Sequence, residues 1–215
     1  HDYSSEQFNY TRKKTKAMYL DDLFCDARLK FKFSVFKNVT MPSIYNQTNQ
    51  NYEWHIYSST IMPEKYKQYL LEITQPFPKI KCFFINNFKE FHEFKELSHL
   101  NYDTEKYCTV RLDDDDALCK NFIETLNKYK NKKGFIISFP NGIKFNYLKN
   151  KVKLGEPLSQ SDIGLGLTGI GKNIYLCGDH SNLHKNNKKF IYDKKPDMYL
   201  CCLGKWCDTK RKKDK

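Results

Sequence analysis

The chain has 215 residues, enough for one domain with a hydrophobic core, and its 40% hydrophobic and 15% aromatic residues exclude a disordered protein. It contains no run of about 18 apolar residues, which excludes a membrane-spanning helix. The polar stretch 1–16 lacks the apolar core of a signal peptide, so we expect a cytoplasmic protein. The net charge of +12 favours a polyanionic partner or the surface of an anionic membrane; a bias of the whole composition toward lysine accounts for it equally well.

Helix and strand patterns alternate along the first part of the chain. Their apolar spacing predicts helices over residues 27–46, 64–73, 88–97 and 118–129 and strands over residues 52–57, 81–85 and 106–112. Pro42 falls inside the first of these helices, where it kinks the helix or starts a second one. Alternation of this kind indicates an α/β fold in which helices flank a mostly parallel sheet, and such sheets bind ligands beyond the carboxyl ends of their strands.

The second half of the chain has a less regular pattern. Asn141-Gly142 lies between apolar stretches at 135–140 and 143–148, and Asn-Gly between two strand patterns predicts a tight hairpin. Residues 173–177 predict one further strand. We therefore expect a smaller antiparallel part in the C-terminal half of a single domain, with a basic tail at 205–215.

The eight cysteines are even in number, as in a disulfide framework. Several lie in apolar strand or helix patterns, however, so buried free thiols explain them more simply. Cys201, Cys202 and Cys207 form the one local cluster in the sequence. Because these three lack the paired Cys-x-x-Cys spacing of zinc-binding motifs, the sequence does not predict a zinc site there.

Four consecutive aspartates, Asp113–Asp116, directly follow the strand expected at 106–112. Like charges at this spacing repel one another, and three arrangements relieve the repulsion. The run is solvated on a loop, or Asp116 caps the next helix, or Mg²⁺ or Mn²⁺ neutralises the charge and shares its shell with substrate phosphates. The apolar strand before the run fixes its start and favours the cation. Arg111, just before the run, is suited to offset the charge or to bind a phosphate.

Two segments resemble a known family. Arg111–Leu118 reads Arg-Leu-Asp-Asp-Asp-Asp-Ala-Leu and resembles the Arg-Leu-Asp-x-Asp-Asp-Ala-Leu stretch of the rhamnosyltransferase family, relatives of inverting glycosyltransferases with a GT-A fold. Residues 42–57, here called the Pro-Ser block, resemble that family's Pro-Ser-x-x-x-Gln-Thr-x-x-x-Phe-x-Trp segment, and Met62-Pro63 resembles the Leu-Pro that follows it. Arg28 falls where the family has an arginine on its first long helix.

This resemblance implies a metal-dependent glycosyltransferase of GT-A-like fold, with a nucleotide-binding half at about 1–118 and an acceptor-binding half at about 119–200. It implies that Asp113 and Asp115 bind Mn²⁺ or Mg²⁺. A late histidine, His180 or His184, completes the metal shell, or both are ordinary surface residues of a polar loop. Residues at the end of the strand over 52–57 line the donor pocket or only form a turn. The expected donor-binding residues are Arg28, Tyr57, Ser58, Arg111, Asp113 and Asp114.

An inverting enzyme also needs a carboxylate that deprotonates the acceptor hydroxyl. Asp162 is the first candidate, because the nearby glycines let the backbone pass close to a sugar; Glu156 is the second and Asp179 the third. The resemblance fades after Leu126 and does not fix this base. The apolar strand with which family members begin also has no counterpart before Ala17.

Two other functions explain parts of the sequence. A metal-dependent nuclease or phosphotransferase would use the same aspartates, but it needs further acids and a lysine around two metal ions. A nucleic-acid-binding module accounts for the charge and the aromatic residues, but the aspartates repel phosphate unless a metal fills them. We therefore expect a nucleotide-sugar donor, a glycan or glycolipid acceptor, peripheral contact with an anionic membrane, and no nucleic acid.

Overall fold

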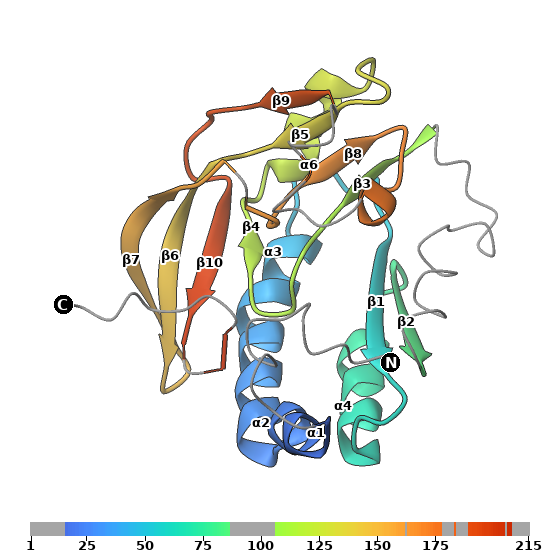
Figure 1. Cartoon of the computed structure of the whole chain (residues 1–215), viewed down its shortest axis with the longest axis vertical. Coiled ribbons are helices and arrows are strands. Elements are labelled where there is room, and N and C mark those ends of the chain that lie inside the picture. The colour runs from blue at the N-terminus through green and yellow to red at the C-terminus, as the bar shows by residue number, and fades with distance from the viewer. Residues whose placement is uncertain are drawn as a thin grey trace.

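The computed structural model describes residues 16–86, 106–161, 163–177, 183, 189–204 and 206–207, whose strands form three small sheets (Figure 1). The helical segments are α1 (Lys16–Phe24), α2 (Asp26–Val35), η1 (Phe36–Thr40), α3 (Met41–Tyr45), α4 (Glu64–Thr74), α6 (Phe122–Leu126), η4 (Asn127–Tyr129) and η5 (Ile174–Cys177). The strands are β1 (Trp54–Ser59), β2 (Ile80–Ile85), β3 (Cys108–Val110), β4 (Ala117–Leu118), β5 (Ile136–Ser138), β6 (Asn141–Leu148), β7 (Lys151–Ser159), β8 (Thr168–Ile170), β9 (Phe190–Tyr192) and β10 (Tyr199–Leu203). None of the helices in these ranges is long and apolar enough to cross a bilayer.

The helix predicted over residues 27–46 is confirmed as one column made of α2, η1 and α3 (Figure 1). The residues at the joints, Val35, Thr40 and Met41, all have right-handed helical dihedral angles. η1 is a π-helical turn, a form that occurs where the regular i→i−4 hydrogen bonds are interrupted. Pro42 follows it in the first turn of α3, where the missing N–H of proline is tolerated. Pro42 thus starts a new helical segment without ending the column.

The strand, helix and strand predicted between residues 52 and 85 are confirmed as β1, α4 and β2. The two strands pair in parallel, from Trp54 opposite Ile80 to Ser59 opposite Ile85. On α4, Tyr66 and Leu70 are buried against one face of this pair and against α2. This unit is a β-α-β crossover of the kind that the alternating pattern indicates.

The remaining strands form two four-stranded sheets with the orders β3-β8-β5-β9 and β4-β10-β6-β7. In the first sheet β5 and β9 are parallel, while β3 and β5 both run antiparallel to β8. In the second sheet β6 and β10 are parallel, while β4 and β7 run antiparallel to their neighbours. The α/β class is confirmed, but the described strands form small mixed sheets rather than one mostly parallel sheet.

The physical reason is the short connections between these strands. A parallel pair needs a crossover of about a dozen residues or more, whereas six residues separate β3 from β4 and two separate β6 from β7. The helix predicted over residues 118–129 begins later than expected, because Leu118 belongs to β4, and it then runs as α6 and η4 to Tyr129. The strand predicted at 173–177 is also wrong, since the 3-10 turn η5 occupies this position. The helix predicted at 88–97 lies outside the described residues.

The hairpin predicted at Asn141-Gly142 is wrong as well. Both residues lie inside β6, which continues to Leu148 and pairs with β7. The turn of this hairpin is Lys149-Asn150, whose φ angles of 48° and 60° are those of a two-residue primed turn. Gly142 serves packing instead, because a Cβ at this position would overlap the ring of Tyr199.

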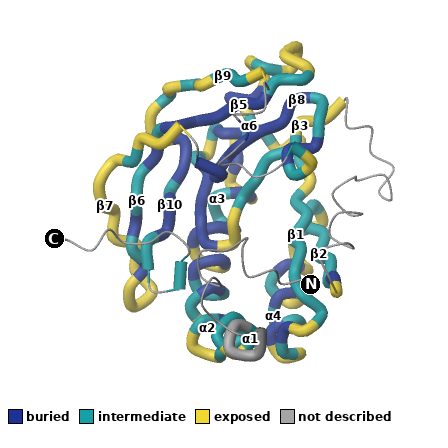
Figure 2. Tube along the Cα trace, in the orientation of Figure 1, coloured by how far each residue is buried: buried dark blue, intermediate teal, exposed yellow. Residues whose placement is uncertain are grey.

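The largest apolar cluster lies where α3 and α6 meet strands of both mixed sheets. Strands β5 and β8 are buried throughout, whereas β7 forms an exposed edge (Figure 2). Leu118, two residues after the last of the four aspartates, belongs to this cluster. The aspartates are therefore followed directly by a residue that is fixed in the core.

The Pro-Ser block holds the segment that follows the aspartates. The side-chain amide of Gln47 donates hydrogen bonds to the carbonyl oxygens of Ser43 and Cys119 at 2.7 and 2.8 Å. Its side-chain oxygen accepts from the backbone N–H of Ile123 at 3.0 Å. Gln47 is only 3% exposed, so these contacts satisfy its buried polar atoms. This part of the block docks α3 against the chain downstream of the acidic run.

We expect Gln47→Met to lower the free energy of unfolding by about 2–3 kcal/mol, because each unsatisfied buried polar group costs roughly 1–3 kcal/mol. Methionine has a similar shape but leaves the carbonyl of Cys119 and the N–H of Ile123 without this partner. Equilibrium unfolding in urea measures the loss. Gln68→Met on the exposed side of α4 is the control, with an expected change within about 0.5 kcal/mol. Equal stability of the two variants would contradict the docking role of Gln47.

Candidate active site

The acidic turn, Asp113–Asp116, connects the two mixed sheets, since it runs from the end of β3 to β4. Backbone hydrogen bonds hold the chain on both sides of it. Before the turn, the N–H of Arg111 donates to the carbonyl of Leu167 at 3.0 Å, and the carbonyl of Arg111 accepts from the N–H of Gly166 at 2.9 Å. At the far end, the N–H of Cys202 on β10 donates to the carboxylate of Asp116 at 2.8 Å. The turn is thus attached to one sheet at each end.

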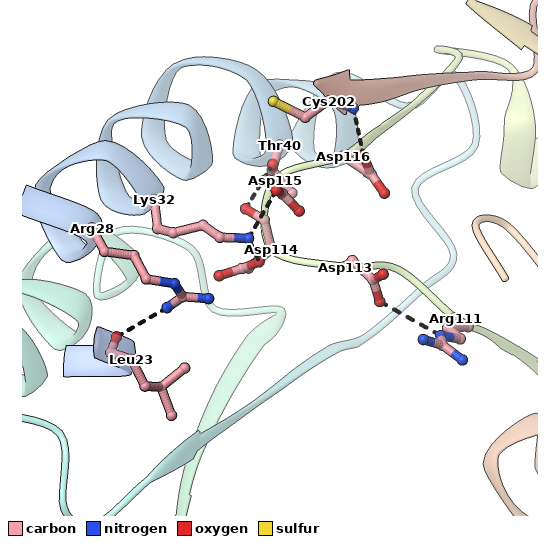
Figure 3. A network of polar contacts seen from close by, with 10 residues as sticks. All are labelled: Leu23, Arg28, Lys32, Thr40, Arg111, Asp113, Asp114, Asp115, Asp116 and Cys202. Atoms are coloured by element: carbon pink, nitrogen blue, oxygen red, sulfur yellow. Dashed lines mark hydrogen bonds and ion pairs between the residues drawn. The ribbon is translucent and has the colours of Figure 1, made fainter. Parts of the chain in front are cut away.

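Lys32 reaches from α2 to two of the four aspartates (Figure 3). Its ammonium lies 2.9 Å from a carboxylate oxygen of Asp114 and 2.8 Å from one of Asp115. The side chains of Lys32 and Asp115 are 7% and 9% exposed, whereas that of Asp114 is 59% exposed. The hydroxyl of Thr40 also donates to the backbone carbonyl of Asp114 at 3.1 Å. A buried lysine therefore offsets part of the negative charge.

The charges in this group are strongly coupled. Burial lowers the pKa of Lys32, but the two carboxylates outweigh this and hold its pKa above the ordinary range. Burial and the adjacent Asp114 carboxylate raise the pKa of Asp115, although Lys32 opposes them. Burial also tends to raise the pKa of Asp114, but the charges of Lys32 and then Arg28 outweigh it and bring the pKa of Asp114 below its usual value. Asp114 is therefore the carboxylate that is ionised most readily beside Lys32.

Asp116 points away from solvent and serves the fold. Burial, followed by the charges of Asp115 and Asp113, raises the pKa of Asp116 well above its usual range. The residues after it form β4 rather than a helix, so Asp116 caps no helix here. The run is not solvated as a whole either, since Asp113 and Asp114 are exposed while the other two aspartates are buried.

Asp113 takes part in a second, outer cluster. The Nε of Arg111 lies 3.5 Å from a carboxylate oxygen of Asp113, and the two side chains are 29% and 52% exposed. Burial raises the pKa of Tyr175 on η5 to about 12, and the charges of Arg111 and Asp113 and the backbone of Leu112 also act on its phenol. Tyr57 of β1 is a further electrostatic neighbour of Tyr175. The structure thus brings Arg111, Asp113 and Tyr57 together as predicted site residues, and it adds Tyr175.

Arg28 and Ser58 lie differently with respect to the turn. Arg28 precedes Lys32 by four residues on α2, a spacing that places both side chains on one face of the helix. Its guanidinium donates to the carbonyl of Leu23 at 3.0 Å, and its charge helps to lower the pKa of Asp114. Arg28 therefore lies on the same side of the turn as Lys32 (Figure 3). The hydroxyl of Ser58 contacts the sulfur of Met62 at 3.7 Å, which is a local contact that does not bring Ser58 to the turn.

The other predicted site residues are not gathered at the turn. Asp162 and His180, with the alternatives Asp179 and His184, lie outside the described residues. Glu156 is described and lies exposed on β7. In the order β4-β10-β6-β7, three strand spacings of about 4.8 Å each place β7 roughly 14 Å from β4. Glu156 is therefore remote from the acidic turn.

Two residues of the site were missed in the sequence. Lys32 stands three residues from Leu29 and three from Val35, which are both buried on α2. A lysine on the buried stripe of an amphipathic helix is the signal that would have found it. Tyr175 offered no such signal, because the pattern around it predicted a strand, whereas the 3-10 turn η5 presents the phenol to Arg111.

A hard cation fits the outer side of the turn. The carboxylates of Asp113 and Asp114 are more than half exposed, and Mg²⁺ and Mn²⁺ take oxygen ligands of this kind together with water and substrate phosphates. Lys32 holds one oxygen of Asp114 and one of Asp115, but the side chain of Asp115 is only 9% exposed whereas that of Asp114 is 59% exposed. Asp115 therefore joins such a shell only if Lys32 moves. Asp113 and Asp114 are thus the accessible ligand pair.

A family model described as "Putative rhamnosyl transferase" matches residues 3–177, which is more than half of the chain. The chain belongs to the rhamnosyl transferase family. The match confirms the resemblance carried by Arg111–Leu118 and the Pro-Ser block. It includes α2, β1, the acidic turn and η5, and hence both clusters of the site, whereas β10 lies beyond the residues matched to the rhamnosyl transferase family. A comparison with curated proteins found no match.

Proposed function

We propose that this member of the rhamnosyl transferase family is a metal-dependent glycosyltransferase whose acidic turn binds the diphosphate of a nucleotide-sugar donor. One observation carries the proposal. Asp113 and Asp114 present two exposed carboxylates on a turn that hydrogen bonds attach at both ends, with the guanidinium of Arg111 beside them. The family name supports sugar transfer as the reaction and a deoxyhexose, such as rhamnose on dTDP, as the sugar.

Asp113 and Asp114 are the residues that would hold Mg²⁺ or Mn²⁺. When bound, such an ion supplies positive charge that offsets the charge developing on the leaving nucleoside diphosphate. Asp115 and His180 are the further ligands that the resemblance implies. A carboxylate oxygen of Asp115 now lies 2.8 Å from the ammonium of Lys32. Asp115 can therefore bind the ion only if its carboxylate leaves Lys32.

The neighbouring side chains divide into those that contact the donor and those that position the turn. Arg111 is partly exposed and suited to bind a phosphate oxygen, and its charge acts on the nearby phenol of Tyr175. Tyr57 extends this outer cluster toward β1 and is suited to contact the nucleotide. Lys32 is 7% exposed and cannot reach the donor, so its part is to hold Asp114 and Asp115 in place.

The reaction that we propose is an inverting transfer to a hydroxyl of a glycan or glycolipid. Such a transfer requires a carboxylate that accepts the proton of that hydroxyl. Asp162 remains our proposal for this base. Glu156 is a poor alternative, since it lies roughly 14 Å from the turn on the far edge of its sheet.

The burial of Lys32 also argues against the phosphotransferase alternative. A nuclease or phosphotransferase needs a lysine that reaches the substrate phosphate among its metal-binding acids. Lys32 is the lysine closest to the aspartates among the contacts of the described residues, and its ammonium is enclosed by Asp114 and Asp115.

A thermal-shift screen of UDP-, GDP- and dTDP-sugars, with Mn²⁺ and with EDTA, tests the proposal. One nucleotide class should raise the midpoint of unfolding by roughly 5–10 °C at a hundredfold excess over its Kd, since that excess stabilises the folded state by about 2.7 kcal/mol. EDTA should abolish the shift, because the ion joins the donor to the turn. An equal shift in EDTA would contradict metal dependence, and the lack of a shift by any nucleotide sugar in Mn²⁺ would contradict the proposed donor.

A further inference from the structure

A second group of metal-ligating side chains lies behind the acidic turn. Strand β10 ends at Leu203, and the N–H of Cys207 then donates to the carbonyl of Gly204 at 3.3 Å, which turns the chain back toward Cys202. The two thiols and the carboxylate of Asp115 converge here, and the pKa of the Cys207 thiol is raised by Cys202, by burial and by Asp115. Cys202 is buried and Cys207 is partly buried in an apolar cluster between α2, β4 and β6.

The positions of the three ligand atoms suit a tetrahedral ion. The two sulfurs and a carboxylate oxygen of Asp115 all lie within 4.8 Å of one another. With bonds of about 2.3 Å to sulfur and about 2.1 Å to oxygen, the ligand atoms of a tetrahedral Zn²⁺ are roughly 3.4–3.8 Å apart. Shifts of about 1 Å or less in side chains that already touch would therefore close the shell.

The chemistry of the three ligands selects a thiophilic ion. Thiolates prefer Zn²⁺ and related soft or borderline ions, whereas Mg²⁺ and Mn²⁺ prefer oxygen. Two thiolates and one carboxylate carry three negative charges, and a divalent ion together with the ammonium of Lys32, 2.8 Å from Asp115, balances them. Such a balance is required in a buried site, because an uncompensated charge there is costly.

We propose that Cys202, Cys207 and Asp115 bind a thiophilic divalent ion, Zn²⁺ by chemistry, which ties the end of β10 to the back of the acidic turn. Both thiol protons leave to solvent when the ion binds, and one solvent molecule takes the fourth position. The ion is separate from the hard cation proposed at Asp113 and Asp114, and its role is to fix the turn. Lys32 orients the carboxylate of Asp115 from the other side.

The sequence pattern does not predict this site. Cys202 and Cys207 are separated by four residues instead of two, and Asp115 is remote along the chain. A disulfide between the two cysteines is the competing arrangement. A disulfide would join only the two sulfurs, whereas an ion also engages the Asp115 oxygen that lies within 4.8 Å of both, and this convergence favours the ion.

Titration of the full chain with Co²⁺ in a phosphine reductant tests the proposal without any measurement of activity. We expect one equivalent to produce a near-ultraviolet thiolate-to-cobalt charge-transfer band, and Zn²⁺ to displace it. Cys207→Ser should weaken binding by about 100-fold or more, as expected for the loss of a metal contact. Cys108→Ser, an exposed thiol on β3, is the matched control and should bind as wild type does.

Circular dichroism of Cys207→Ser shows whether the variant folds, and Cys207→Asp provides a second variant that keeps a ligand at the position. Cys207→Asp should retain binding with a weaker charge-transfer band, because one of the two thiolates is lost. A missing band in the reduced wild-type chain would overturn the proposal, as would a band that Cys207→Ser leaves unchanged. A Cys202–Cys207 disulfide found by mass spectrometry without reductant, together with no band after reduction, would assign the pair to redox chemistry instead.

Discussion

Replacing Lys32 with methionine should lower the free energy of unfolding by about 3–5 kcal/mol, the range for removing one partner of a buried ion pair. Methionine has a similar length and keeps the packing of α2, so the loss comes mainly from the charge. Without Lys32, Asp115 remains 9% exposed next to Asp114 and has lost its nearest cation. Unfolding in urea, followed by the fluorescence of the two tryptophans, measures the difference.

The matched control is Lys37→Met, on the same helical column but exposed, where we expect a change within about 0.5 kcal/mol. The double variant Lys32→Met/Asp115→Asn should recover part of the loss, because it removes the unpaired buried charge together with its partner. A Lys32→Met protein within about 1 kcal/mol of wild type would mean that the pair adds little to the stability of the turn.

Asp113→Asn should lower kcat/KM for the donor found in the screen by about 100-fold or more, which is about 2.7 kcal/mol of transition-state stabilisation. The substitution keeps the shape of the side chain but removes one exposed carboxylate from the proposed metal shell. The unfolding free energy should change little, since the side chain is 52% exposed and makes a 3.5 Å contact with Arg111. Steady-state transfer assays with saturating Mn²⁺ measure the effect.

Two comparisons make this test specific. Asp21→Asn, an exposed aspartate on α1, should leave kcat/KM unchanged. Asp115→Asn should mainly affect the unfolding free energy, because its carboxylate pairs with Lys32 inside the protein. A different outcome would be a larger loss of kcat/KM for Asp115→Asn than for Asp113→Asn when the two variants are equally stable. That result would assign the metal to Asp115 and would mean that the Asp115 carboxylate leaves Lys32 when the metal binds.

Local patterns predicted the N-terminal part of the fold. The column of α2, η1 and α3 and the β1-α4-β2 unit have regular apolar spacing over long stretches, and packing there follows the same spacing. The acidic turn was located because an apolar strand leads directly into four charges. Further along, Asn141-Gly142 and Lys149-Asn150 show why the prediction failed: the turn formed at two residues with positive φ, while the glycine was needed beside Tyr199.

The arrangement of the site depended on contacts between distant segments, which no local pattern records. Lys32 and Asp115 lie on opposite sides of the Pro-Ser block in the sequence, and contacts such as that of Gln47 with Cys119 dock the helical column onto the chain around the turn. The same holds for Tyr175 beside Arg111. The resemblance identified the residues of the turn, but it could not divide the four aspartates into two that face solvent and two that are buried.

The position of β10 has a consequence for how the chain can be shortened. This strand lies between β4 and β6, yet it follows the last residue matched to the family. A protein truncated at Cys177 would retain every matched residue, but it would lose β9 and β10, expose the edges of β4, β5 and β6, and remove the N–H that binds Asp116. The limits of sequence similarity are therefore not the limits of the folding unit, and expression of an intact fold requires the segment through Leu203.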